Sequence, residues 1–146
     1  MYYGDEVLMK GITNPDGWVR LDFPGGWNGD SIKAYTGKGL NDTALGVQQL
    51  IKKLANFRKT SPALTTGKLM QYIPVDGLYV YFRYTNAQTI MCIMNTSDKE
   101  QAVNFNSYPE RTTGFGGGRN VLTGQSVSSS FTIPSMQMWV VELVKY

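Results

Sequence analysis

The sequence contains no histidine and a single cysteine, Cys92. The absence of histidine excludes a Ser-His-Asp or Cys-His catalytic site and argues against a zinc site. A lone cysteine cannot form an internal disulfide, and its place in the apolar run 90–94 predicts a small buried side chain. Any catalysis by these residues would have to use carboxylates, lysine or tyrosine, and we predict neither a metal nor a cofactor.

Long apolar runs and basic runs are missing as well. The longest apolar run, residues 90–94, is far too short to span a membrane. Lysine and arginine are dispersed, the net charge is only +3, and no basic run is interleaved with aromatic residues. We therefore expect neither a membrane nor a nucleic-acid partner.

The residues that are abundant indicate a fold with a core and many turns. Hydrophobic residues make up 42% of the 146 residues and aromatic residues 12%, which is enough to bury a core. The 16 glycines favour loops and sandwich turns over a helical bundle. The length fits one domain, or one small domain with an additional fragment.

Residues 42–60 are predicted to form a helix. Apolar side chains recur there at three- and four-residue steps, at Val47, Leu50, Ile51, Leu54 and Phe57. Asn41 or Thr43 can cap the first turn, and Pro62 ends the helix because the residue before a proline is pushed out of helical geometry. The apolar face of this helix needs a cover, either the rest of the chain or a second copy of it.

From residue 67 onward the hydrophobic period changes to two, which is typical of strands. We predict strands over 68–74, 78–84, 89–95, 101–105, 119–122, 130–133 and 137–144. Asp76-Gly77 is a hairpin turn signal, and residues 106–118 are polar and glycine-rich, as in a loop. About eight short strands with regular turns indicate a mainly β fold, a Greek-key antiparallel β-sandwich.

The first part of the chain is predicted to be a short buried strand followed by a long loop. Residues 2–9 begin with two tyrosines, which favour a strand. Residues 10–40 contain a turn signal at 14–17 and further glycine pairs, so we expect irregular structure. The aromatic residues in this loop need something to pack on and therefore argue against disorder.

Two motifs in this first part resemble a known family. Residues 2–6 (YYGDE) and 20–27 (RLDFPGGW) resemble the end of the catalytic barrel in the alpha-amylase family, glycoside hydrolase family 13, and most of all its neopullulanase and cyclomaltodextrinase branch. Residues 54–64, 76–83 and 120–124 resemble later parts of the same family. The resemblance implies that residues 1–64 are the remnant of a (β/α)₈ barrel, namely its last strand, loop and helix. It implies a C-terminal β-sandwich domain at 65–146.

The resemblance also implies a function for the parent protein. It would be a retaining hydrolase of starch- or pullulan-derived α-glucans, and its catalytic carboxylates would come from barrel strands that precede Met1. We therefore name no catalytic residue and expect this chain alone to be structural. Its expected partners are the missing catalytic barrel, α-glucan through the parent enzyme, or a second copy through the helix face. The parent is expected to be periplasmic or extracellular.

Four loop residues are predicted to bind substrate: Trp18, Arg20, Asp22 and Trp27. Active sites of (β/α)₈ barrels lie where the strands end, so the loop after the last strand would line the cleft. Indole rings stack on sugars, while arginine and aspartate supply paired hydrogen bonds. The alternative is that Arg20 and Asp22 hold the loop and the tryptophans pack under it.

A second hypothesis is a free-standing carbohydrate-binding β-sandwich module. It is based on an aromatic platform formed by Tyr72, Tyr79, Tyr81 and Tyr84. The alternation of tyrosines with Val80 and Phe82 is also typical of sandwich packing or of a domain interface. The sequence leaves these alternatives open.

Overall fold

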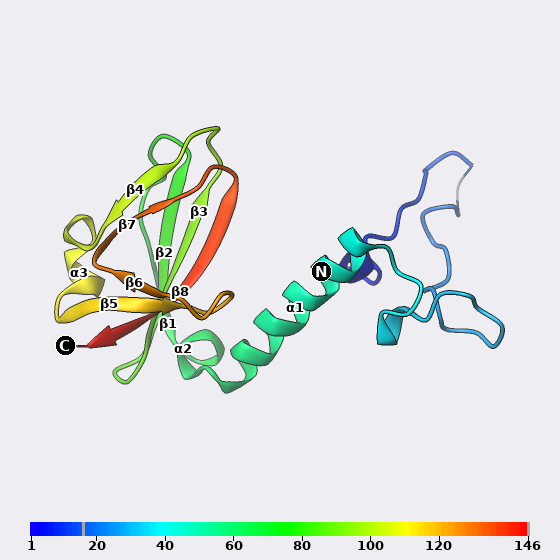
Figure 1. Ribbon diagram of the computed structural model, residues 1–146, viewed down its shortest axis with the longest axis horizontal. Coiled ribbons are helices and arrows are strands. Elements are labelled where there is room, and N and C mark those ends of the chain that lie inside the picture. The colour runs from blue at the N-terminus through cyan, green and yellow to red at the C-terminus, as the bar shows by residue number, and fades with distance from the viewer. Residues whose placement is uncertain (16, 146) are drawn as a thin grey trace. The chain divides into compact units, whose positions relative to one another are not determined.

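The computed structural model describes residues 1–15 and 17–145 (Figure 1). The chain divides into two compact units, Met1–Lys53 and Leu54–Tyr146, and the division lies within helix α1 (Asp42–Thr60). The predicted domain boundary between residues 64 and 65 stays a prediction. Among the described residues, the helices lack the length and hydropathy that crossing a membrane requires. Besides α1, the helical elements are η1 (Asp5–Val7), η2 (Ala34–Thr36), α2 (Pro62–Thr65), η3 (Phe105–Ser107) and α3 (Pro109–Thr112).

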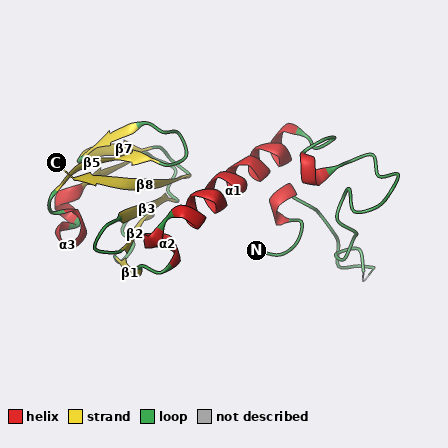
Figure 2. Cartoon of the chain, turned by 90° about the horizontal axis from the view of Figure 1, so that it is seen from below, coloured by secondary structure: helices red, strands yellow, loops and turns green. Residues whose placement is uncertain are grey.

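The second unit is an antiparallel β-sandwich, which confirms the predicted fold class. Its strands are β1 (Lys68–Gln71), β2 (Leu78–Tyr84), β3 (Thr89–Asn95), β4 (Gln101–Asn104), β5 (Phe115–Asn120), β6 (Ser126–Ser128), β7 (Ser130–Ile133) and β8 (Gln137–Lys145). One sheet has the order β1-β2-β3-β8-β5-β6, and β4 pairs with β7 in a second sheet. Figure 2 shows these strands together with the short helices α2 and α3.

The main core lies between the two sheets. It consists of Val80, Phe82, Met91, Ile93, Val103, Phe105, Ile133, Val141 and Leu143. Strands β2, β3 and β8 contribute every second side chain to this core, because successive side chains on a strand point to opposite faces. The period-two pattern of the sequence is therefore the pattern of core residues.

Strand β3 is buried on both faces, as its uninterrupted apolar sequence predicted. It lies between β2 and β8, away from the edges of its sheet. On its second face Ile90 and Cys92 form a smaller cluster with Ala63 of α2, and Leu54 and Phe57 of α1 pack against that cluster. The last turns of the predicted helix face are thus covered by the sandwich, whereas Leu50 remains 40% exposed.

Two turns fix the strand registers. Asp76 and Gly77 both have positive φ, 49° and 81°, and the backbone of Val75 and Leu78 closes the turn with two hydrogen bonds of 3.1 and 2.8 Å. This is the type I′ geometry that an Asp-Gly pair favours. At the same end of the sheet, where Asn95 pairs with Leu78, the buried Asn95 amide donates to three backbone carbonyls, those of Lys99, Ile133 and Pro134.

The prediction of a loop over residues 106–118 is wrong in part, because α3 and most of β5 lie within this range. In β5 a Cβ atom at Gly117 would lie 2.3 Å from the Val127 carbonyl oxygen. A Cβ atom at Gly118 would lie 2.6 Å from Val141 Cγ1 and 2.7 Å from a backbone oxygen of β8. These glycines permit close approach of neighbouring chain segments and are not a sign of irregular structure.

The strand predicted at residues 2–9 is also wrong. The structure has the short helix η1 there, after Gly4 with φ 90°. Asp5 Oδ2 accepts a hydrogen bond from Tyr2 N (2.7 Å), and Glu6 Oε2 accepts one from Gly4 N (3.0 Å). A strand needs a neighbouring strand for its backbone hydrogen bonds, and the described residues of the first unit form no named strand. The segment predicted to be a strand therefore takes a local helical turn here.

The remainder of the first unit is the long loop up to α1. Asp16, part of the predicted turn at 14–17, lies outside the described residues. Helix α1 begins as predicted after Asn41, whose Oδ1 accepts a hydrogen bond from Ala44 N (2.9 Å). The buried hydrophobic side chains among the described residues of this unit are Val7, Ala34 and Ala44.

Candidate functional site

The predicted substrate-binding loop contains a shallow hollow of about 220 Å³. It is lined by Asp22, Phe23, Pro24, Trp27, Asp30, Ser31 and Ile32. The structure thus brings Asp22 and Trp27 to one place, while Trp18 and Arg20 do not line this hollow. Trp18 is 55% exposed and Trp27 is 65% exposed, so neither indole is packed under the loop. A role in glucan binding for these four residues stays a prediction.

Asp30 holds this part of the loop in shape. Its Oδ2 accepts hydrogen bonds from Gly25 N (2.9 Å) and Trp27 N (3.0 Å). Gly25 has φ 97°, and a Cβ atom there would lie 2.9 Å from the Lys33 Cα atom. The segment around Lys33 passes close to Gly25, and the Ala34 N–H fixes this approach by donating a hydrogen bond to the Pro24 carbonyl (3.2 Å).

The backbone N–H of Trp27 is the main reason why the pKa of Asp30 lies below its ordinary value of 3.8. Partial desolvation opposes this effect, while the Gly25 N–H and the positive charge of Lys33 add to it. The carboxylate is therefore ionised at neutral pH and accepts hydrogen bonds only. Its observed partners are backbone amides, so its role here is structural.

Sequence reasoning missed Asp30. A signal was present, because an aspartate three residues after Trp27 and directly after Gly29 is typical of a side chain that closes a local turn. The loop-holding role was assigned in prediction to Arg20 and Asp22 instead.

The four tyrosines of the predicted platform lie in three different places. Tyr79 and Tyr81 are neighbours on the outer face of β2, with ring centroids 5.5 Å apart. The Tyr84 ring lies under the Arg111 guanidinium, 4.0 Å from its carbon atom to the ring centroid. Tyr72 lies against Tyr108 instead.

The outer face of the large sheet has a hollow of about 500 Å³ around the first tyrosine pair. It is lined by Arg58, Leu64, Leu69, Tyr79, Tyr81 and Arg83. Arg83 is held by backbone oxygens, since its Nη2 donates to Gly67 O (2.7 Å). Tyr81 pairs with Cys92 of β3 in the sheet, and burial raises the pKa of both side chains. This face combines exposed apolar surface with fixed polar groups.

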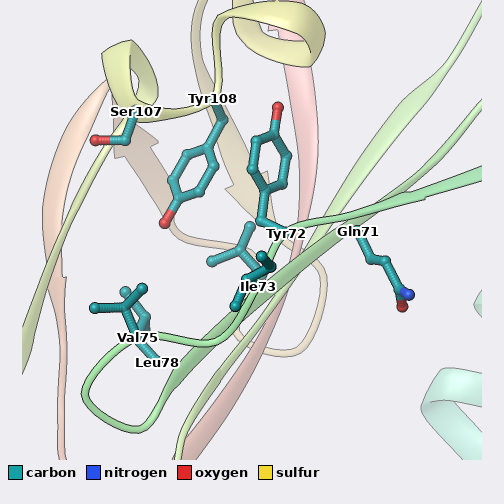
Figure 3. A pocket seen from close by; sticks show the side chains of 8 residues that line it. Gln71, Tyr72, Ile73, Val75, Leu78, Ser107 and Tyr108 are labelled. Atoms are coloured by element: carbon teal, nitrogen blue, oxygen red, sulfur yellow. The ribbon is translucent and has the colours of Figure 1, made fainter.

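A larger hollow of about 580 Å³ lies on the core side of β2 (Figure 3). Its lining residues are Gln71, Tyr72, Ile73, Val75, Leu78, Val80, Ser107 and Tyr108. Figure 3 shows the Tyr72 and Tyr108 rings side by side, with Ile73, Val75 and Leu78 below them and Gln71 turned away. Within the described residues, no group of three or more acidic, cysteine or histidine side chains could hold a metal ion.

Comparisons with known proteins place this geometry in context. Residues 69–142, from β1 to β8, match the family described as the cyclo-malto-dextrinase C-terminal domain. An Anoxybacillus alpha-amylase has a similar fold, with 20% identity and a TM-score of 0.71 over 100% of this chain and 29% of that one. The alpha-amylase of Geobacillus thermoleovorans, solved with acarbose, gives 19% identity and a TM-score of 0.69, covering 99% of this chain and 29% of its own.

A maltogenic amylase from S. marinus is similar over 97% of this chain and 16% of its own length, with 18% identity and a TM-score of 0.64. The chain thus spans less than a third of each of these structures. At these identities the likeness establishes the fold. It extends over the first unit as well as the sandwich, because the matches cover nearly the whole chain.

Proposed function

We propose, because this chain belongs to the cyclo-malto-dextrinase C-terminal domain family, that it is the C-terminal part of a retaining α-glucan hydrolase. The proposed substrates of the parent enzyme are starch- or pullulan-derived glucans. The single observation that carries the proposal is the family match over residues 69–142, which reaches from β1 into β8. The fold likeness of the remaining residues to alpha-amylases supports it.

We assign a structural, non-catalytic role to the chain itself. Retaining glycosidases need two carboxyl groups about 5–5.5 Å apart, one of them with a raised pKa. Here Asp5, Glu6 and Asp30 accept hydrogen bonds from backbone amides. Glu110 accepts one from the Tyr72 hydroxyl, and Glu142 accepts one from the Gln88 amide. Each of these carboxylates already holds part of the fold.

The surfaces proposed to contact the missing barrel are apolar and exposed. On the outer face of the sandwich Leu69 is 56% exposed beside the Tyr79–Tyr81 pair. In the first unit the exposed side chains include Leu8, Ile12, Val19 and Leu21, each between 42% and 50% exposed. Contiguous apolar surface on a soluble protein commonly marks an interface. A barrel packed on these residues would remove them from water.

The test has two parts. The reading frame immediately before the Met1 codon should encode a (β/α)₈ barrel with the catalytic carboxylates, and a frame without a barrel would overturn the proposal. The purified 146-residue chain should release no reducing sugar from pullulan or soluble starch. Co-expression with the upstream barrel as a separate chain should give a complex that does.

Matched variants locate the interface. Leu69→Asp should weaken the complex at least tenfold, because it places a charge on the proposed contact face. Met136→Asp is the control, since Met136 is 75% exposed in the β7–β8 turn and its positive φ of 54° suits aspartate. Equal binding by both variants would contradict the assignment of the outer face. Sedimentation of the chain alone would reveal the alternative, self-association through the helix face, as a concentration-dependent dimer.

A further inference from the structure

The hollow beside Tyr72 and Tyr108 differs from the outer face in being built around fixed aromatic rings. The ring centroids of Tyr72 and Tyr108 are 4.9 Å apart at an interplanar angle of 78°. Each centroid lies 6.0 Å from that of Phe82, whose side chain is fully buried. The Tyr72 hydroxyl donates to Glu110 Oε2 at 2.5 Å. Both rings are therefore held in place without a ligand.

The lining is uncharged, so it selects a neutral ligand. Its residues are aromatic, aliphatic, hydroxyl-bearing or amide-bearing, and none is lysine, arginine, aspartate or glutamate. Burial, with the Glu110 hydrogen bond as a further cause, raises the pKa of Tyr72 to about 12. Burial also raises the pKa of Tyr108. Both phenols are consequently protonated and neutral near pH 7.

The shape of the lining fits a molecule with one apolar and one hydroxylated side. Ile73 is 88% exposed and Val75 is 64% exposed, so the mouth of the hollow presents apolar surface to water. In Figure 3 the Tyr108 hydroxyl points toward Val75, whereas the Ser107 hydroxyl points away from the two rings. Glucose units have C–H faces that pack on aromatic rings and hydroxyl groups that accept or donate hydrogen bonds. The volume of about 580 Å³ is within the usual range of small-ligand sites.

We propose that this hollow binds a short segment of α-glucan, with glucose packed against Tyr108 and the aliphatic rim. The identity of the ligand rests on the proposed function, which makes α-glucan the substrate of the parent enzyme. The geometry of the site does not depend on that function. The site uses only Tyr72 of the four tyrosines predicted from the sequence, and its second ring, Tyr108, comes from the β4–β5 connection.

The outer tyrosine pair is a poorer candidate for the same ligand. The Tyr79 hydroxyl donates to Gln71 Oε1 (2.8 Å), and Tyr81 lies opposite Cys92 of β3. Two arginines, Arg58 and Arg83, line the hollow beside them. That face is also the one proposed to contact the barrel, which would close it to a polysaccharide.

The experiment is a calorimetric titration of the 146-residue chain with maltoheptaose, with cellohexaose as the linkage control. We expect sub-millimolar binding of maltoheptaose and at least tenfold weaker binding of cellohexaose. Val75→Glu should weaken maltoheptaose binding at least tenfold, because it places a charge in the mouth of a neutral site without touching the core. Tyr79→Ala, on the outer face, should change it less than twofold.

A second variant guards against misfolding. Tyr108→Ala should abolish binding. Its circular dichroism spectrum and melting curve establish whether the sandwich of this variant is intact. If the Tyr108→Ala variant is unfolded, the test rests on Val75→Glu. Flat heats with the unmodified chain, equal binding of cellohexaose, or loss of binding in Tyr79→Ala alone would overturn the proposal. A chain that binds an apolar peptide or dye but no sugar would also overturn the proposal. Sugar binding by a chain whose upstream frame lacks a barrel would refute the proposed function and leave this site standing.

Discussion

The two units of the chain keep their structure by different means, the second by burying large apolar side chains and the first by local hydrogen bonds. In Leu54–Tyr146 large side chains such as Phe82, Met91 and Ile93 are removed from water by two sheets. In Met1–Lys53 the buried hydrophobic residues are small or medium-sized, and the indoles of Trp18 and Trp27 are more than half exposed. The first unit keeps its shape through local hydrogen bonds to Asp5, Glu6 and Asp30.

The comparison teaches that apolar content and apolar burial are separate properties of a sequence. Both units are rich in aromatic and aliphatic residues, but among the described residues the named strands that bring such side chains together all lie in the second unit. In the proposed parent enzyme, the exposed apolar residues of the first unit would pack on the barrel. The geometry of the first unit is fixed in advance by carboxylate-to-amide bonds, and its apolar residues are left available.

The largest expected effect is in the sandwich core. Phe82→Ala should lower the free energy of unfolding by about 3–5 kcal/mol, because it leaves a cavity where a fully buried ring contacted both sheets. Urea denaturation followed by circular dichroism measures this change. A loss below about 1 kcal/mol would mean that the core is not the source of stability.

A smaller loss is expected at the end of β3. Asn95→Ala removes the amide that donates to the carbonyls of Lys99, Ile133 and Pro134, and it leaves buried acceptors without a partner. Such a change costs about 1–3 kcal/mol, so the urea midpoint should fall while the slope stays constant. Thr96→Ala, at the next position and exposed, serves as the control. An unchanged midpoint in Asn95→Ala would contradict this account.

In the first unit, replacing a large aromatic side chain by alanine should leave the free energy of unfolding almost unchanged. Trp27→Ala removes the largest type of side chain but one that is 65% exposed, so global unfolding should change by about 0.5 kcal/mol or less. The same urea experiment provides the number. A loss comparable to that of Phe82→Ala would show that the first unit has a core of its own and would remove the contrast between the units.

The smallest effect is the titration of Asp30. Its folded-state pKa is lowered, so its contribution to loop structure is present above its ordinary pKa of 3.8 and is lost as the pH falls through the lower folded value. The amide resonances of Gly25 and Trp27, followed by NMR, should shift with a midpoint below 3.8. Asp30→Asn should abolish that shift. A midpoint above 3.8 would mean that the two amides do not bind the carboxylate.

Patterns with a single physical cause were predicted well from the sequence. The period-two segments gave β2 and β3 with their exact bounds, and the apolar spacing with the Asn41 cap gave α1. The resemblance to the alpha-amylase family is confirmed by the family match over 69–142. In these cases the side chains that define the pattern are also the ones that pack.

Elements that depend on distant partners were missed. Ser126–Ser128 has one apolar residue, Val127, which is too little for a period-two pattern, and the segment forms strand β6 by pairing with β5. Gly117 and Gly118 read as a loop until the neighbouring backbones are known. The strand predicted at 2–9 failed for the opposite reason, since no strand in the described part of the chain pairs with this segment. The candidate site was missed in part because Tyr108 lies far from Tyr72 in sequence.

The buried position of Cys92 makes its thiol a built-in reporter of local opening. Its thiol is 3% exposed within the central strand of the large sheet, and the sequence has no other cysteine. A thiol-modifying reagent could reach it only in molecules in which α2 and the end of α1 have moved off this face or the sheet has come apart. Each modified molecule would therefore record one opening event, and mass spectrometry could count the modified molecules by their added mass.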